Sequence, residues 1–117
     1  MRRLAFVLIL LGCDGGPAVL GEEARIKELE ASAQAVDVVL RSPNRGEVVL
    51  SGHIGQVCSE GCWFYLLGES GVLYVKLDLT NGLQVSPKSV GKKALVKGTL
   101  QMDSPTHTLL AETVVLY

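Results

Sequence analysis

The sequence predicts a mainly β protein: a small five-stranded barrel preceded by an N-terminal helix. From Gly46 onward, apolar and polar residues alternate, as they do in strands with one buried face. Five such segments follow one another, at residues 47–57, 62–67, 72–79, 93–101 and 109–116. Gly52 and Gly55 interrupt the long first segment, and a long connection, 80–92, separates the third from the fourth. A bent first strand that serves both halves of the barrel favours an OB-fold over an SH3-like barrel.

Residues 22–43 are expected to form a helical spacer that caps one end of the barrel, which takes residues 44–117. Apolar residues recur at the three- and four-residue spacings of a helix, at Ile26, Leu29, Ala33, Val36 and Leu40. The β-branched run 36–40 allows a separate short element there, and Pro43 disfavours helix in the residue before it. A helix that binds a partner is the alternative.

The first twelve residues have the features of a secretory signal peptide. Arg2 and Arg3 precede eight apolar residues, far fewer than the roughly 20 that span a bilayer. The following run, Leu10-Leu11-Gly12-Cys13, resembles the processing site of bacterial lipoproteins, in which the cysteine is lipidated and becomes the new N-terminus. The resemblance implies a signal peptide at 1–12, a lipid on Cys13 and a flexible tether over 13–21.

A lipid on Cys13 implies a bacterial cell-envelope protein, anchored to a membrane at its periplasmic face. Asp14 resembles the signal that keeps enteric lipoproteins at the inner membrane. Two of the three cysteines remain after Cys13 is used, an even number that suits an oxidising compartment. The net charge is −1, and loss of Arg2 and Arg3 leaves nine basic against twelve acidic residues, −3. Such an acidic chain is a poor electrostatic match for nucleic acid.

Cys58 and Cys62 flank the turn-forming residues Ser59-Glu60-Gly61. In an extended strand their Cα atoms would be about 13 Å apart, whereas a disulfide needs them within about 7 Å. Gly61 permits a tight reversal, so we expect both sulfurs at the neck of a hairpin. Four interpretations remain open: a disulfide, which the compartment favours; ligands for copper or zinc, with His53 or another group as a further donor; a redox couple; and two free thiols.

Trp63, Tyr65, Tyr74 and Lys76 fall on one side of the second and third predicted strands. In OB-folds the outward face of these strands binds oligonucleotides or oligosaccharides. The four residues are therefore candidates for a ligand face. The alternative is that Trp63 and Tyr65 pack inside the barrel or under the helix, because Trp is usually largely buried.

The motif Val57-Cys58, then Gly61-Cys62-Trp63, recurs in an uncharacterised OB-fold family of bacterial envelope proteins, which this chain resembles. Residues 85–92 and 95–98 resemble a later part of that family, which has a Pro…Gly…Val-x-Gly pattern. The likeness covers roughly residues 36–117 and implies the fold. Because the family has no established biochemistry, it implies no activity.

The sequence carries no recognisable catalytic motif. It has no Ser-His-Asp arrangement, no glycine-rich phosphate loop and no paired-carboxylate motif, so we do not expect an enzyme. Two hypotheses about function follow. In the first, the chain is an envelope lipoprotein whose OB-fold binds a small ligand or an envelope protein. In the second, Cys58 and Cys62 handle a metal or take part in redox chemistry.

Overall fold

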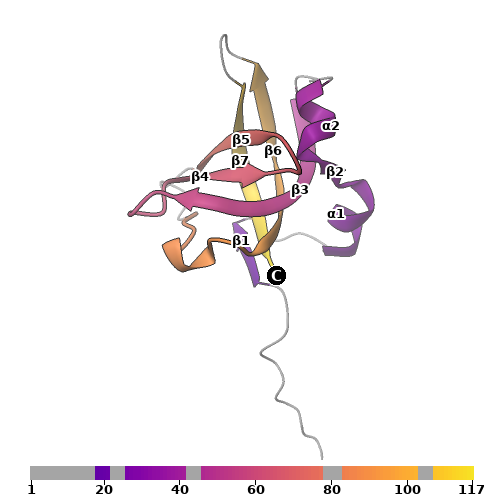
Figure 1. Ribbon diagram of the computed structural model, residues 1–117. Helices are drawn as coiled ribbons and strands as arrows, with labels where there is room; N and C mark the ends of the chain where they lie inside the picture. Colours follow the sequence, from indigo (N-terminus) through magenta and orange to yellow (C-terminus); the bar gives the residue numbers. More distant parts are fainter. Residues whose placement is uncertain (1–17, 22–25, 42–45, 78–82, 103–106) are drawn as a thin grey trace, which may run out of the picture.

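A computed structural model describes residues 18–21, 26–41, 46–77, 83–102 and 107–117 (Figure 1). Before the barrel come β1 (Ala18–Gly21), α1 (Ile26–Ser32), β2 (Gln34–Ala35) and α2 (Val36–Arg41). The barrel and its connections follow as β3 (Gly46–Val57), β4 (Trp63–Leu67), β5 (Val72–Leu77), the 3-10 helix η3 (Pro87–Ser89), β6 (Lys93–Met102) and β7 (His107–Leu116). Where they are described, the five predicted strands agree with β3 to β7 to within two residues.

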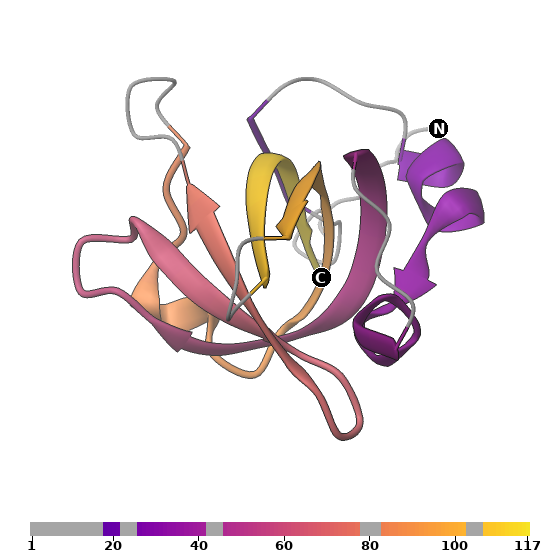
Figure 2. The ribbon, with the colours of Figure 1, turned by 90° about the horizontal axis from the view of Figure 1, so that it is seen from above.

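Strands β3 to β7 close on themselves as a barrel. β3 pairs with β4, β4 with β5, β5 with β7, β7 with β6, and β6 returns to β3. The β5–β7 pair is parallel and the other four are antiparallel. This is the closed five-stranded arrangement of an OB-fold, and the predicted fold class is confirmed. Figure 2 shows the strands curling around a common interior, with the helices beside β3.

The bend in β3 allows this one strand to belong to both halves of the barrel. Its residues 46–53 pair with β6, and its residues 53–57 pair with β4, with an irregular register between Ile54 and Val57. Gly52 lies where the partner changes. A Cβ on Gly52 would come within 2.6 Å of the Leu67 carbonyl oxygen, so a larger residue would push β4 away. The predicted bend is therefore confirmed.

The barrel interior is filled by every second residue of its strands. Fully buried side chains include Leu50, Ile54, Phe64, Leu66, Leu73, Val75, Val96, Leu100, Leu109 and Val114. Burying apolar side chains of this size removes roughly 1.5–3 kcal/mol of unfavourable hydration each. The same alternation points the intervening residues of β4 and β5 outward.

The helix expected across residues 22–43 is two short helices in its described part, separated by β2. Gln34 and Ala35 of β2 pair in parallel with Leu50 and Ser51 of β3. Leu29 of α1 packs with Leu95 and Val115, in a cluster separate from the barrel core that α2 joins. One straight helix cannot direct its apolar stripe at both clusters, so the chain turns between them. α2 coincides with the separate short element that the sequence allowed at 36–40.

β1 was not predicted, because its residues fell in the expected tether. It pairs antiparallel with the end of β7, from Ala18 opposite Leu116 to Gly21 opposite Thr113. β5 pairs with an earlier part of β7, residues 108–111, so β1 satisfies backbone groups that β5 leaves open on the same strand. The last four residues of the expected tether are thus fixed to the barrel.

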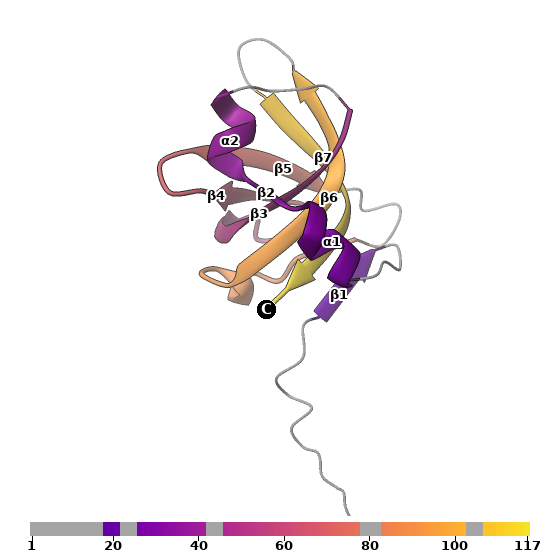
Figure 3. The ribbon, with the colours of Figure 1, turned by 90° about the vertical axis from the view of Figure 1, so that its right-hand side faces the viewer.

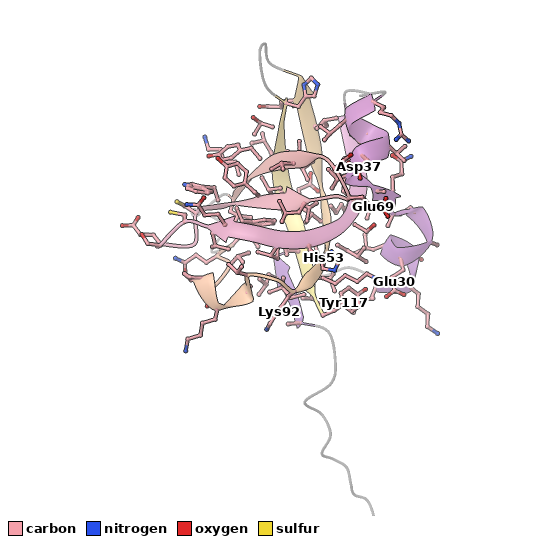
Figure 4. The ribbon with its side chains drawn as sticks, viewed as in Figure 1. Glu30, Asp37, His53, Glu69, Lys92 and Tyr117 are labelled. Carbon is pink, nitrogen blue, oxygen red and sulfur yellow. The ribbon has the colours of Figure 1, made fainter. Side chains whose placement is uncertain are left out.

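α1 is also tied to the C-terminal end of the chain. The Tyr117 hydroxyl donates a hydrogen bond of 2.5 Å to Glu30 Oε2, and Lys93 Nζ lies 5.5 Å from the centre of the Tyr117 ring. Figure 3 shows α1 beside the C-terminus, and Figure 4 shows the Glu30 and Tyr117 side chains together. Burial, and then the Glu30 carboxylate, raise the pKa of Tyr117 to about 12.

Candidate functional site

Trp63, Tyr65, Tyr74 and Lys76 form what we call the aromatic face, on the outside of β4 and β5. The ring centroids are 5.4 Å apart for Trp63 and Tyr65, 5.9 Å for Trp63 and Tyr74, and 6.0 Å for Tyr65 and Tyr74. These are spacings at which tilted aromatic rings attract one another. All three rings are half-buried and Lys76 is exposed.

The register of the β4–β5 ladder creates this face. Trp63 lies opposite Lys76, and Tyr65 lies opposite Tyr74. Residues directly opposite on one face of an antiparallel pair have Cβ atoms about 5 Å apart, so their side chains meet. The predicted sharing of one outward face is confirmed. The alternative, in which Trp63 and Tyr65 pack inside the barrel, is wrong, because Phe64 and Leu66 take the interior positions.

The outer surface continues onto β7, which the sequence did not indicate. Tyr74 pairs with Thr108 and Lys76 with Leu110 in the parallel β5–β7 ladder, so the partners point to the same side. Thr108 and Leu110 are half-buried. Their place beside the aromatic face depends on a parallel register between strands far apart in the chain. Local alternation shows which side of β7 they share, but not which residues of β5 they meet.

The cysteine turn, residues 58–62, adjoins one end of the aromatic face, since Cys62 directly precedes Trp63. Cys58 N–H donates to the Trp63 carbonyl at 2.9 Å, and Gly61 N–H donates to the Cys58 carbonyl at 2.8 Å. Cys58 Sγ and Cys62 Sγ lie 2.6 Å apart. Both sulfurs are at the neck of the β3–β4 hairpin, as predicted. Both cysteines are free thiols here, so the expected disulfide stays a prediction.

The turn is held by three hydrogen bonds to neighbouring segments. Val85 N–H donates to the Gly61 carbonyl at 3.3 Å, Gln84 Nε2 to the Glu60 carbonyl at 2.8 Å, and Leu77 N–H to the Cys62 carbonyl at 3.0 Å. Gly61 has φ +78°, and a Cβ on it would lie 2.7 Å from the Val85 carbonyl oxygen. A glycine is therefore needed for conformation and for space.

The two thiols are electrostatically unlike. The pKa of Cys58 is lowered, chiefly because the Cys62 S–H donates to Cys58 Sγ and also because the backbone N–H groups of Cys62 and Glu60 do so. The pKa of Cys62 is raised, first because its S–H is engaged in that bond, and then by burial and by the charge on Cys58. When one proton is lost from the pair, Cys58 therefore carries the negative charge.

His53, the expected third metal donor, lies away from the cysteines. It pairs with Leu67 at one end of the β3–β4 ladder, whereas Cys58 follows the other end. Four residues lie between them, so five steps of extended strand place them about 16 Å apart at about 3.3 Å per step. Figure 4 shows His53 along β3 and the sulfur atoms, in yellow, far to its left, towards the turn end of the hairpin. The structure does not support His53 and the cysteines as one copper or zinc site. Within the described ranges, no group of three or more His, Cys, Asp or Glu residues is placed to hold a metal.

A separate open pocket of about 580 Å³ lies between α2, β3 and the turn that joins β4 to β5. His53, Arg41 and Lys93 line it, together with Asp37. Asp37 is engaged by the turn: its carboxylate accepts the Glu69 N–H at 2.7 Å and the Ser70 hydroxyl at 3.3 Å. No local pattern in the sequence indicates this pocket, because its residues come from four separate segments.

Comparison with known proteins supports the fold and goes no further. No protein-family model matches the chain, and no curated protein matches it. Among solved structures, that of the hypothetical protein YgiW from E. coli, an OB-fold protein, is similar, with a TM-score of 0.56 and 20% sequence identity. The alignment covers 74% of this chain and 90% of that one. At this identity the likeness shows the fold alone. That the chain belongs to the envelope family, as its Cys-turn-Gly-Cys-Trp motif suggests, stays a prediction.

The predicted anchor residues, Cys13 and Asp14, lie outside the described residues. In the part of the chain that the structure describes, no helix has the length and apolar character needed to cross a membrane.

Proposed function

We propose that this chain is an OB-fold binding module that holds its ligand on the aromatic face. The observation that carries the proposal is the group of three half-buried rings, mutually within 6.0 Å, on the outside of the barrel. Water-exposed ring surface is unfavourable, and these rings are kept at the surface by a strand register that cannot shift without moving the core. The same strands of other OB-folds present their ligand sites.

An oligosaccharide is the ligand class that this surface fits best. Sugar rings offer flat C–H faces to aromatic rings and hydroxyl groups to the tyrosine O–H and lysine N–H groups. A single-stranded nucleic acid would need several cations along its phosphates. Lys76 is the one cation of the aromatic face, and the chain is acidic overall, at −1.

The single tryptophan of the sequence makes the proposal directly measurable. Titration with soluble chitohexaose or cellohexaose is expected to give a saturable change in Trp63 fluorescence. Tyr74→Ala should weaken binding about tenfold, the loss expected when a stacking contact of about 1.4 kcal/mol is removed. Lys76→Ala should also weaken it. Lys88→Ala is the matched control, because Lys88 is an exposed lysine on η3, outside the aromatic face.

Circular dichroism of each variant separates lost binding from lost fold. A fluorescence response to oligothymidylate alone would contradict the oligosaccharide assignment. Equal affinities for Tyr74→Ala, Lys76→Ala and Lys88→Ala would contradict the aromatic face itself.

We also propose that the protein is a lipoprotein of the bacterial cell envelope, anchored through Cys13 at the periplasmic face of a membrane. The support is the signal-peptide pattern and the Leu-Leu-Gly-Cys run. Four residues lie between Cys13 and Ala18, the first residue of β1, so five steps of chain reach at most about 17 Å. The anchor would hold the barrel against the membrane surface. Cys13→Ser is expected to abolish incorporation of labelled palmitate and to leave the precursor unprocessed; equal labelling of the variant would contradict the anchor.

A further inference from the structure

We infer that Cys58 and Cys62 form a thiol–disulfide exchange site in which Cys58 attacks and Cys62 resolves. The first ground is proximity. The two Sγ atoms lie 2.6 Å apart in the reduced state, and an S–S bond is about 2.05 Å long. Small side-chain rotations interconvert the two states, so the pair can be oxidised and reduced without refolding the hairpin.

The second ground is that the turn does not need the bridge to keep its shape. The backbone bonds within the turn, and those to Gln84 and Val85, already fix the hairpin neck. A dithiol held in this way loses little conformational entropy when its disulfide forms. Both cysteines are half-buried, which leaves the sulfurs within reach of a partner's disulfide.

The third ground is the asymmetry between the two sulfurs. Cys58 Sγ accepts the Cys62 S–H, and backbone N–H groups of the turn also stabilise its negative charge. Cys62 keeps its proton to higher pH, because that proton is donated in the hydrogen bond to Cys58. The thiolate is the attacking species in disulfide exchange, so Cys58 takes this role.

The substrate class is a disulfide, written R–S–S–R′, in another protein or in glutathione disulfide. The Cys58 thiolate attacks one sulfur, forms a mixed disulfide with R, and expels R′–S⁻, which takes up a proton. Cys62 then loses its proton and attacks Cys58 Sγ, which forms the Cys58–Cys62 disulfide and expels R–S⁻, which takes up the second proton. Two electrons and two protons pass to the partner in all. The reverse sequence transfers the disulfide to a partner dithiol.

The inference is independent of the aromatic face, although the two sites adjoin at Trp63. Reaction at the sulfurs needs no sugar, and sugar binding needs no thiol. Each can therefore fail without the other.

The test uses the full chain with Cys13→Ser, so that Cys58 and Cys62 are its only thiols. Limiting iodoacetamide followed by peptide mass mapping is expected to label Cys58 faster than Cys62, because the thiolate is the reactive species and the pKa of Cys58 is lowered while that of Cys62 is raised. This measurement needs no substitution at the pair. Labelling of both cysteines at equal rates, or of Cys62 first, would overturn the assigned roles.

Glutathione disulfide then tests the exchange itself. The reduced chain is expected to form the Cys58–Cys62 disulfide and release two glutathione molecules. Cys62→Ser should stop at a mixed disulfide on Cys58, and Cys58→Ser should react much more slowly. No oxidation of the reduced pair by glutathione disulfide would overturn the inference. So would copper that stays bound through purification, blocks exchange and is lost with Cys62→Ser.

Discussion

The carboxylate of Asp37, on α2, accepts the backbone N–H of Glu69, in the turn between β4 and β5, at 2.7 Å. This bond joins the segment before the barrel to the far end of the hairpin that carries the aromatic face. Gly68 allows the close approach, because a Cβ there would lie 2.6 Å from Asp37 Oδ2. The Glu69 N–H is also the main reason that the pKa of Asp37 lies below its ordinary value, with the Ser70 N–H contributing.

Asp37→Asn should therefore destabilise the protein at neutral pH and have less effect in acid. The folded-state pKa of Asp37 is depressed, so its carboxylate contributes stability above the unfolded value of about 3.9. That contribution is lost as pH falls through the folded-state pKa. Thermal melts at neutral pH and near pH 3 should show a difference in Tm of a few degrees that narrows in acid. An unchanged difference would contradict this role of Asp37.

Gly61→Ala should destabilise the protein more than Gly91→Ala. Both glycines have positive φ, +78° and +91°, which costs an alanine roughly 1–2 kcal/mol. Nothing lies within 4 Å of a Cβ on Gly91, whereas a Cβ on Gly61 would lie 2.7 Å from the Val85 carbonyl oxygen. The difference between the two variants in urea unfolding isolates the contact between the cysteine turn and Val85. Equal losses would show that this contact does not restrict the turn.

Tyr117 should titrate near pH 12, above the ordinary tyrosine pKa of about 10. Burial and Glu30 raise its folded-state pKa, so its contribution to stability is complete below about pH 10 and is lost as pH rises towards 12. Tyrosinate absorbance should show one late step that is absent in Tyr117→Phe. The variant should also lose the stabilising bond to Glu30. A wild-type titration without the late step would contradict the contact.

Oxidation of the cysteine pair should raise Tm without deciding whether the protein folds. The loop that a disulfide would close is short, so we expect a gain on the order of 10 °C. The buried barrel core does not depend on it. Reduced and oxidised chains should give the same β signal in circular dichroism at 25 °C. Loss of that signal on reduction would show that the bridge, rather than the core, maintains the fold.

Much of the barrel could be predicted because each of its strands carries its own signal. Leu73 and Val75 alternate with Tyr74 and Lys76, and that local pattern assigns both the strand and its outward face. The aromatic face could be predicted from the alternating patterns of β4 and β5 and from the hairpin that joins them. β1 and β2 could not be predicted, since four and two residues are too short to show a period.

Long-range contacts account for what the sequence did not reveal. The hydrogen bond between Asp37 and Glu69 joins residues 32 apart in the sequence, and the local sequence around neither residue predicts it. The helical period between Ile26 and Leu40 is expressed in α1 and α2, but pairing of β2 with β3 interrupts the helix at Gln34. His53 lies on β3, the strand that leads to Cys58. Its distance from the two sulfurs became clear only once the β3–β4 register was known.

The measurement that tests the aromatic face most directly is a ¹⁵N NMR titration of the labelled chain with chitohexaose. The account predicts that the shifted resonances gather on β4, β5 and the neighbouring part of β7, led by the Trp63 indole N–H and the amides of Tyr65 and Tyr74. Shifts confined to the pocket around Arg41 and His53, or no shifts at saturating sugar, would contradict it.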